Sequence, residues 1–197
     1  MKLCVFQGTF NPIHNAHLKM ADFVLKNYGF DKIIFIPAYK PPHKAYDISL
    51  TPHRLEMVKL AALTNPNFKV SDIEYQKERS SYTYLTVLEL YKKYDIEGKI
   101  NFIIGTDAFK KIDTWYEADK LKELVEFIVF VRENELEDKK YEELRKKGYS
   151  FRFASMDFED ISSTTIRKYI HEGKSIDNLV TNKVKGYIEK NGLYKNE

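Results

Sequence analysis

The stretch QGTFNPIHNAHL, residues 7–18, follows a short apolar run and leads into a helical pattern. A glycine-containing turn between a buried strand and a helix is typical of parallel α/β sheets, whose ligands bind beyond the carboxyl ends of the strands. The turn also holds His14 and His17, two of the five histidines in the chain, three positions apart. This junction predicts both the fold class and the place of the chemistry.

Short β-rich runs alternate with helical patterns along the rest of the chain. Several of these runs are continuously apolar, as strands covered on both faces tend to be. The predicted strands span residues 2–6, 32–37, 68–73, 100–105, 126–131 and 150–155. The alternation predicts an α/β fold: a Rossmann-like open parallel sheet with right-handed crossovers and helices on both faces.

Helical patterns fill the intervals between the predicted strands. Residues 17–29 place apolar side chains at helical spacing and end at Gly29. In the next pattern we expect Thr51 as the N-cap and Pro52 at the first helical position. Further helices are expected at 82–95, 139–148, 163–173 and 177–192. The expected organisation is a single domain, residues 1–197, with a helical C-terminal end.

Composition and charge limit the classes of function. A chain of 197 residues with 43% hydrophobic residues can bury its own core. A net charge of +3 does not suggest nucleic-acid binding through bulk charge. No apolar run approaches the roughly 20 residues that span a bilayer, and no signal peptide is recognisable. With Cys4 as its one cysteine, we expect a cytoplasmic protein without nucleic-acid or membrane partners; a homo-oligomer stays open.

The histidine turn has the composition of a phosphate site. Gly8 lets the backbone approach a ligand closely, and Thr9 and Phe10 can offer main-chain N–H groups. His14 and His17 lie near a helix start, where the partial positive charge favours anions, and they could stabilise charge on a leaving pyrophosphate. Two alternatives remain at this point: a structural histidine pair, and a zinc site, for which no third ligand lies nearby in sequence.

The stretch ISSTTIRKYI, residues 161–170, is a second candidate anion site. Ser162, Ser163 and Thr164 offer hydroxyl groups at a helix start, and Arg167 follows one turn later. Hydroxyls, main-chain N–H groups and a guanidinium together bind phosphate at helix N-termini. The alternative is a serine N-cap followed by a solvated arginine. The histidine turn in the same chain favours the anion site.

Both stretches resemble known signatures. GTFNPIHNAH resembles (S/T)-F-(D/N)-P-x-H-x-G-H of the nucleotidyltransferase superfamily that shares its fold with class I tRNA synthetases, and ISSTTIR resembles the second signature of that superfamily, ISSTxIR. Four further segments look like bacterial nicotinate-nucleotide adenylyltransferases: PAYKPPHK (37–44), SYT (81–83), GTDAF with Trp115 and Tyr116, and VKGYIEKNGLY (184–194). The resemblance covers nearly the whole chain.

The resemblance implies a reaction in NAD biosynthesis. The family joins nicotinate mononucleotide to the AMP part of ATP and releases pyrophosphate, with Mg²⁺ bridging the phosphates and no metal held mainly by protein. By resemblance, the catalytic residues are His14, His17 and Arg167. The implied ATP-binding residues are Gly8, Thr9, Phe10, His14, His17, Gly105, Asp107, Ser163, Thr164 and Arg167.

The resemblance also implies a substrate pocket, made of Lys44, Thr83, Trp115 and Tyr116. Trp115 would stack on the pyridine ring, and Thr83 with the main-chain N–H of Tyr116 would hold the nicotinate carboxylate. Lys44 would reach a substrate phosphate. From residue type alone, Trp115 could be a core residue, Lys44 a solvated charge and Asp107 a helix N-cap.

Three departures from the family pattern stand out, namely Gln7 and Ala16 where glycine is usual, and Leu85-Thr86-Val87 where Asp-Thr-Leu is frequent. One alternative function is adenylyl transfer to another acceptor, nicotinamide mononucleotide or phosphopantetheine. The other is a non-catalytic nucleotide-binding regulator, supported only by Gln7 and Ala16. A tRNA synthetase fragment is set aside because no KMSKS-like loop is present.

Overall fold

The computed structural model describes residues 1–42, 45, 47–131, 136, 138–156 and 161–196. Its strands form one sheet in the order β3-β2-β1-β4-β5-β6, and every pair is parallel. The strands are β1 (Cys4–Gly8), β2 (Ile33–Pro37), β3 (Phe68–Val70), β4 (Ile100–Gly105), β5 (Val125–Phe130) and β6 (Phe151–Ala154). The α/β fold class and all the predicted strands are confirmed, with ends that shift by one to three residues.

The helices follow the predicted order, with additions between β4 and β5. They are α1 (Asn15–Tyr28), α2 (Thr51–Ala62), α3 (Thr83–Lys93), α4 (Thr106–Phe109), α5 (Ala118–Leu124), α6 (Lys139–Lys146), α7 (Ser163–His171) and α8 (Asn182–Asn191), with 3-10 turns at Ile48–Leu50 and Ile112–Thr114. Gly29 ends α1 in the left-handed conformation, as expected.

Two helix starts differ from the sequence-based expectation. The N-cap of α2 is Leu50, not Thr51, because the 3-10 turn runs directly into the helix and Thr51 is already helical. The last helix begins at 182 instead of 177, because the Thr181 hydroxyl accepts a hydrogen bond from the main-chain N–H of Val184 and caps it there.

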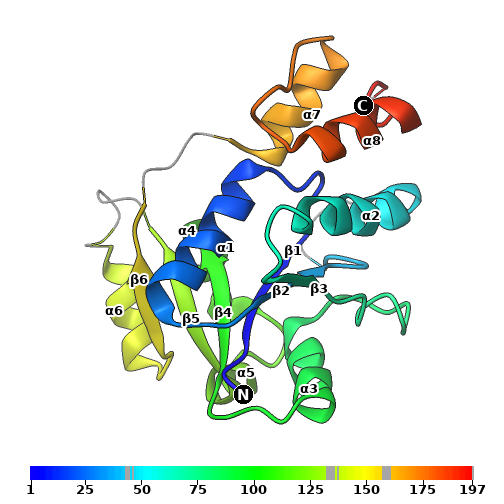
Figure 1. The fold of residues 1–197 in the computed structure, drawn as a ribbon. Helices are drawn as coiled ribbons and strands as arrows, with labels where there is room; N and C mark the ends of the chain where they lie inside the picture. The colour runs from blue at the N-terminus through cyan, green and yellow to red at the C-terminus, as the bar shows by residue number, and fades with distance from the viewer. Residues whose placement is uncertain (43–44, 46, 132–135, 137, 157–160, 197) are drawn as a thin grey trace.

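The sheet separates two apolar layers. Phe6, Phe35 and Ile103 face α1, α2 and the C-terminal helices, whereas Val5, Ile34 and Phe102 face α3, α4, α5 and α6. This alternation follows from the two-residue period of a strand, and burial on both faces explains the continuously apolar strand sequences. Figure 1 shows α1 and α2 on one side of the sheet and α3 and α5 on the other.

The chain reverses its winding direction between β1 and β4. β1 pairs with β2 along its length and with β4 on its other edge, so the loops after β1 and β4 diverge and leave a crevice at their carboxyl ends. α7 and α8 lie beyond this edge, above α1 and α2 (Figure 1).

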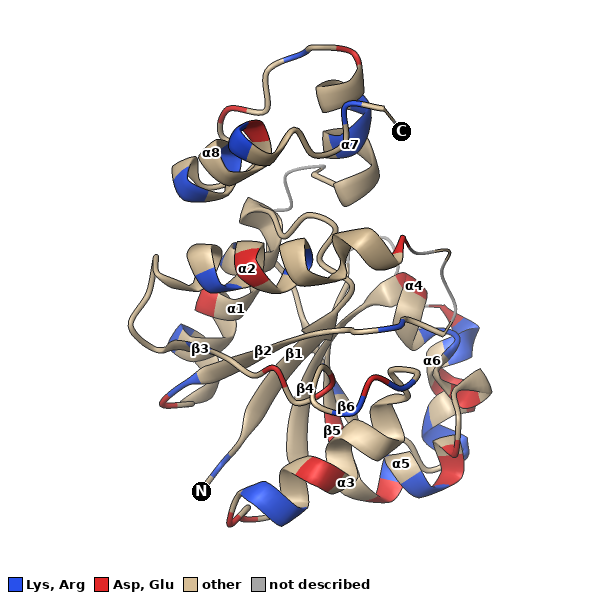
Figure 2. Ribbon diagram, turned by 90° about the vertical axis from the view of Figure 1, so that its right-hand side faces the viewer, with Lys and Arg blue, Asp and Glu red and all other residues tan. Residues whose placement is uncertain are grey.

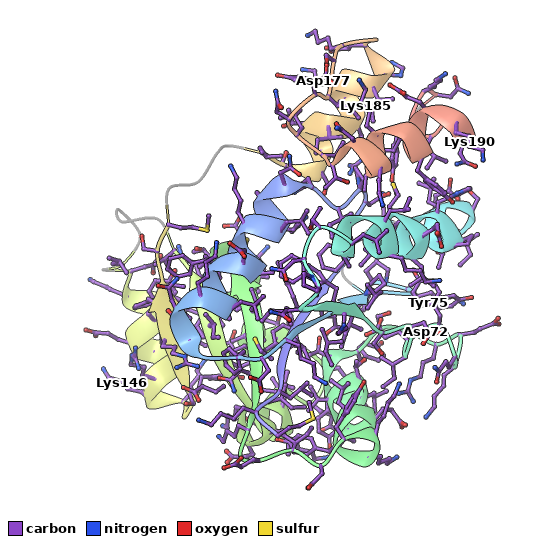
Figure 3. The ribbon with its side chains drawn as sticks, in the orientation of Figure 1. Asp72, Tyr75, Lys146, Asp177, Lys185 and Lys190 are labelled. Carbon is purple, nitrogen blue, oxygen red and sulfur yellow. The ribbon has the colours of Figure 1, made fainter. Side chains whose placement is uncertain are left out.

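The surface carries both signs of charge. Basic and acidic side chains are interspersed on α5 and α6 (Figure 2), and Lys140 pairs with Asp113 at 3.0 Å. On the C-terminal helices Lys185 pairs with Asp177 at 2.7 Å (Figure 3). Within the part of the chain that the structure describes, no helix has the length and apolarity needed to cross a membrane.

Candidate active site

The turn between β1 and α1 is tightly built. Phe10 is buried with φ +49°, and the Asn11–Pro12 peptide is cis. A Cβ on Gly8 would lie 2.9 Å from Cζ of the Phe10 ring. Glycine at position 8 thus leaves room for the Phe10 ring, and Gly8 also lines the adjoining cavity; its close approach to a ligand stays a prediction.

The two histidines are stacked at the start of α1. His14 is the N-cap, and its main-chain N–H donates to Nδ1 of His17 at 3.2 Å. Their ring centroids are 3.7 Å apart with an interplanar angle of 25°. Since Nδ1 of His17 accepts a hydrogen bond, the ring carries its hydrogen on Nε2. Because its Nδ1 caps the helix start, His17 can donate a hydrogen bond from Nε2.

His14 is neutral at physiological pH. Its side chain is only 6% exposed, and burial lowers its pKa from the ordinary value near 6.5 to about 4. A neutral His14 ring places no positive charge against the ring of His17, so the pair can remain stacked without ligand.

The low pKa of His14 predicts an acid-sensitive fold. Between pH 6.5 and pH 4 the unfolded chain binds a proton at this residue that the folded chain does not, so stability falls as the pH falls through that window. We expect His14 to account for a loss of about 3 kcal/mol in unfolding free energy between pH 7 and pH 4. Urea unfolding of wild type and His14→Gln at both pH values measures it.

The exposed His171 supplies the control for this prediction. His171→Gln should keep the wild-type pH dependence, whereas His14→Gln should flatten it. Equal pH dependence in wild type and His14→Gln would contradict the assignment.

The second predicted motif lies against the first. The Ser163 hydroxyl donates to the carbonyl of Pro12 at 2.9 Å, and Nη1 of Arg167 donates to the carbonyl of Asn11 at 2.9 Å. Ser162 caps α7, with its hydroxyl oxygen accepting from the N–H of Thr165. The N-cap role is confirmed for Ser162. Ser163 and Arg167 contact the histidine turn, and anion binding there stays a prediction.

A cavity of about 670 Å³ opens in the crevice between β1 and β4. Six predicted residues line it: Gly8, Thr9, Thr83, Asp107, Trp115 and Tyr116. Seven others lie outside its lining: Phe10, His14, His17, Gly105, Ser163, Thr164 and Arg167. The site thus divides into the cavity and the histidine–α7 cluster, joined through the 9–14 backbone. Lys44 lies outside the described residues.

The structure decides between the alternative positions that the sequence left open for Asp107 and Trp115, and it also places Tyr116. Asp107 lies in the first turn of α4, whose N-cap is Gly105, so Asp107 is not the helix cap that was the alternative. Trp115 both lines the cavity and contacts the core residue Phe102 edge-on at 6.5 Å. Tyr116 is 46% exposed and lies against Tyr82 with ring centroids 4.6 Å apart.

Sequence reasoning missed a buried arginine behind the cavity. Arg54 is 1% exposed, and its guanidinium donates to the carbonyls of Thr9 at 2.8 Å, Ala38 at 2.5 Å and Tyr39 at 3.0 Å. It therefore ties the loop after β1 to the loop after β2. A signal exists in the sequence, because Arg54 falls on the same face of α2 as the buried Met57 and Val58.

Sequence reasoning also missed the buried carboxylate of Glu74, which is 6% exposed. It accepts hydrogen bonds from the side-chain amide of Gln7, the main-chain N–H of Tyr39 at 3.1 Å and the hydroxyl of Thr86 at 2.7 Å. Burial raises the pKa of Glu74, and the hydrogen bonds of its charged form oppose that shift. Gln7, which the sequence showed only as a departure from the family pattern, is thus held by a hydrogen bond to the buried Glu74.

The fold and the two adjoining sequence motifs are those of a nucleotidyltransferase, and residues 5–169 match the family model described as Cytidylyltransferase-like. A Bacillus subtilis nicotinate-nucleotide adenylyltransferase is 40% identical over 195 residues, covering 98% of each chain. A Caldicellulosiruptor saccharolyticus relative, a probable nicotinate-nucleotide adenylyltransferase, is 41% identical over 99% of this chain and 100% of its own. The chain belongs to the nicotinate-nucleotide adenylyltransferases of the cytidylyltransferase-like family.

A solved structure supports the fold. Plasmodium falciparum nicotinic acid mononucleotide adenylyltransferase complexed with NaAD has a TM-score of 0.79 and 21% sequence identity, covering 100% of this chain and 98% of its own. At that identity the likeness concerns the arrangement of the elements. It agrees with the Rossmann-like sheet described above.

Proposed function

We propose that this chain makes nicotinate adenine dinucleotide by direct attack of the nicotinate mononucleotide phosphate on the α-phosphate of ATP. A bond forms between an oxygen of the attacking phosphate and the α-phosphorus, and the bond from that phosphorus to the pyrophosphate oxygen breaks. The observation that carries the proposal is the contact of Ser163 and Arg167 with the histidine turn at the edge of the cavity.

The proposed mechanism relies on positioning and charge stabilisation. The attacking phosphate is already anionic at neutral pH and needs no general base. His17 donates from Nε2 toward the α-phosphate, where charge builds in the transition state. Neutral His14 supports it in the stack.

Donors for the rest of the triphosphate come from the turn between β1 and α1 and from the start of α7. Thr9 and Phe10 present main-chain N–H groups beside Gly8. Ser163, through its main-chain N–H, together with Thr164 and Arg167 holds the β- and γ-phosphates that leave as pyrophosphate. Asp107, beyond Gly105 at the end of β4, accepts hydrogen bonds from the adenosine ribose.

Mg²⁺ enters this proposal with ATP as part of the substrate. Over the described residues, no three His, Cys, Asp or Glu side chains cluster to hold a metal. Mg²⁺ in proteins usually keeps several of its water ligands and is bound largely through substrate phosphates.

The cavity supplies the pyridine site of the proposed reaction. Trp115 stacks on the ring, while Thr83 and the main-chain N–H of Tyr116 meet the carboxylate. The site takes residues from β1 through α7, so we propose that residues 1–197 act as one domain. A cytoplasmic location and a homo-oligomer stay predictions from the sequence.

The substrate pocket predicts a preference for the acid. Main-chain N–H donors can all bond to the oxygens of a carboxylate. In a carboxamide, one of these oxygens is replaced by an NH₂ group, which cannot accept from a main-chain N–H. We expect kcat/KM for nicotinate mononucleotide to exceed that for nicotinamide mononucleotide at least tenfold. Pyrophosphate release and dinucleotide formation, followed together with each acceptor and with phosphopantetheine, measure this. Equal or faster turnover of the amide would overturn the substrate assignment.

A further inference from the structure

Gln7 lies at the end of β1, in the lining of the cavity, between Thr83 and Glu74. We propose that Gln7 is a specificity-determining residue: it draws the hydroxyl hydrogen of Thr83 away from the cavity and so weakens the discrimination between a pyridine carboxylate and a pyridine carboxamide. The inference rests on the proposed function and concerns the same pocket.

The direction of the hydrogen bonds begins at Glu74. Its carboxylate receives the side-chain N–H of Gln7, the hydroxyl of Thr86, the main-chain N–H of Tyr39 and the hydroxyl of Ser81. All four groups donate to its two oxygens, so the carboxyl group of Glu74 is the acceptor throughout this network. Glu74 follows β3, next to Tyr75 in the sequence, and is buried among these donors.

This carboxylate fixes the orientation of the Gln7 amide. An amide placed between two partners can ordinarily be turned either way. Here the NH₂ group must face Glu74, so Oε1 of Gln7 faces Thr83 and accepts from its hydroxyl at 2.9 Å. A hydroxyl has one hydrogen. Thr83 therefore shows the cavity only the lone pairs of its Oγ1.

An acceptor at that position treats the two substrates differently. A carboxamide can donate its NH₂ to Oγ1 of Thr83 while its carbonyl accepts from main-chain N–H groups. A carboxylate meets the same N–H groups but finds an acceptor at Oγ1, where neither partner has a hydrogen to give. Main-chain donors still favour the acid, but Gln7 reduces the ratio of kcat/KM for the acid to that for the amide.

Removing the Gln7 amide should release the Thr83 hydroxyl. With no acceptor at position 7, the hydroxyl can rotate and donate to a carboxylate in the cavity. Gln7→Ala should raise the ratio of kcat/KM for the acid to that for the amide about tenfold, the usual size of one gained or lost hydrogen bond in a closed site.

The matched control is Thr86→Val. Thr86 also donates to Glu74, but it does not line the cavity. Like Gln7→Ala, this change removes one donor from the buried carboxylate, and it leaves the Thr83–Gln7 hydrogen bond in place. It should keep the wild-type acid-to-amide ratio, whatever it does to thermal stability.

The experiment is a cycle of wild type, Gln7→Ala, Thr83→Val and the double variant, measured with both mononucleotides at saturating ATP and Mg²⁺. With Gln7 present, Thr83→Val should reduce turnover of the amide substrate more than turnover of the acid substrate. Combined with Gln7→Ala, the same change should reduce turnover of the acid substrate more than turnover of the amide substrate.

Two results would overturn the inference: Thr83→Val affecting the acid more in the presence of Gln7, or Thr86→Val shifting the ratio as much as Gln7→Ala. The proposed function fails separately, if wild type releases no pyrophosphate with nicotinate mononucleotide.

Discussion

Replacing His17 by alanine should lower kcat for adenylyl transfer about 100- to 1000-fold, the effect of removing one preorganised donor from a developing charge. His17 is held in place by the main-chain N–H of His14 and by the edge contacts of its ring with Phe6 and Phe10. Its donor is therefore oriented before ATP arrives, and no reorganisation is needed during the reaction. Steady-state pyrophosphate release at saturating substrates measures kcat directly.

A second variant separates chemistry from helix capping. His17→Ala removes the acceptor of the His14 N–H and should lower stability by about 1 kcal/mol. Glutamine at this third helical position can keep that acceptor, as in a capping box. His17→Gln should thus recover stability without recovering wild-type kcat, and exposed His171→Ala should leave kcat unchanged. Wild-type kcat in folded His17→Ala would rule out the proposed role.

Arg54→Met should be the most destabilising single substitution of this series, with a loss of about 3–5 kcal/mol in unfolding free energy. It leaves the buried carbonyl of Ala38 and the partly buried carbonyls of Thr9 and Tyr39 without this donor. It also removes the positive charge that interacts with Glu74. Methionine fills much of the same volume, so the loss reports hydrogen bonding and charge more than a cavity.

The control for Arg54 lies on the same helix. Lys59 is half-exposed and forms a surface ion pair with Glu56 at 3.7 Å, so Lys59→Met should change stability by less than about 1 kcal/mol. Urea unfolding at pH 7 compares the three proteins. A similar small change for Arg54→Met would show that its hydrogen bonds are replaced by water.

The sheet was predictable because burial on both faces leaves a local mark. Runs such as INFIIG, residues 100–105, are apolar at every position except Asn101, and the structure places this run as a strand. α5 had no such mark: its sequence ADKLKEL is short and mostly charged, and it buries only Ala118 and Leu121. Its helical state depends on packing that no local pattern contains.

The buried polar residues of the site were the hardest to predict. Arg54 and Glu74 look like ordinary surface charges, because their partners are mainly main-chain groups and side chains distant in sequence. Motif residues such as His17, Ser163 and Arg167 were found because their types and spacing carry chemistry. The contacts of Ser163 with Pro12 and of Arg167 with Asn11, each across more than 150 positions, became visible only in three dimensions.

Asn11 has a consequence for the order in which the protein is made. Its carbonyl accepts from Arg167, and its side-chain oxygen accepts from the hydroxyl of Tyr194 at 2.7 Å. The histidine turn leaves the ribosome more than 150 positions before the residues that contact Asn11. A nascent chain can build its sheet during translation, yet the turn gains all of these contacts only once Tyr194 has emerged.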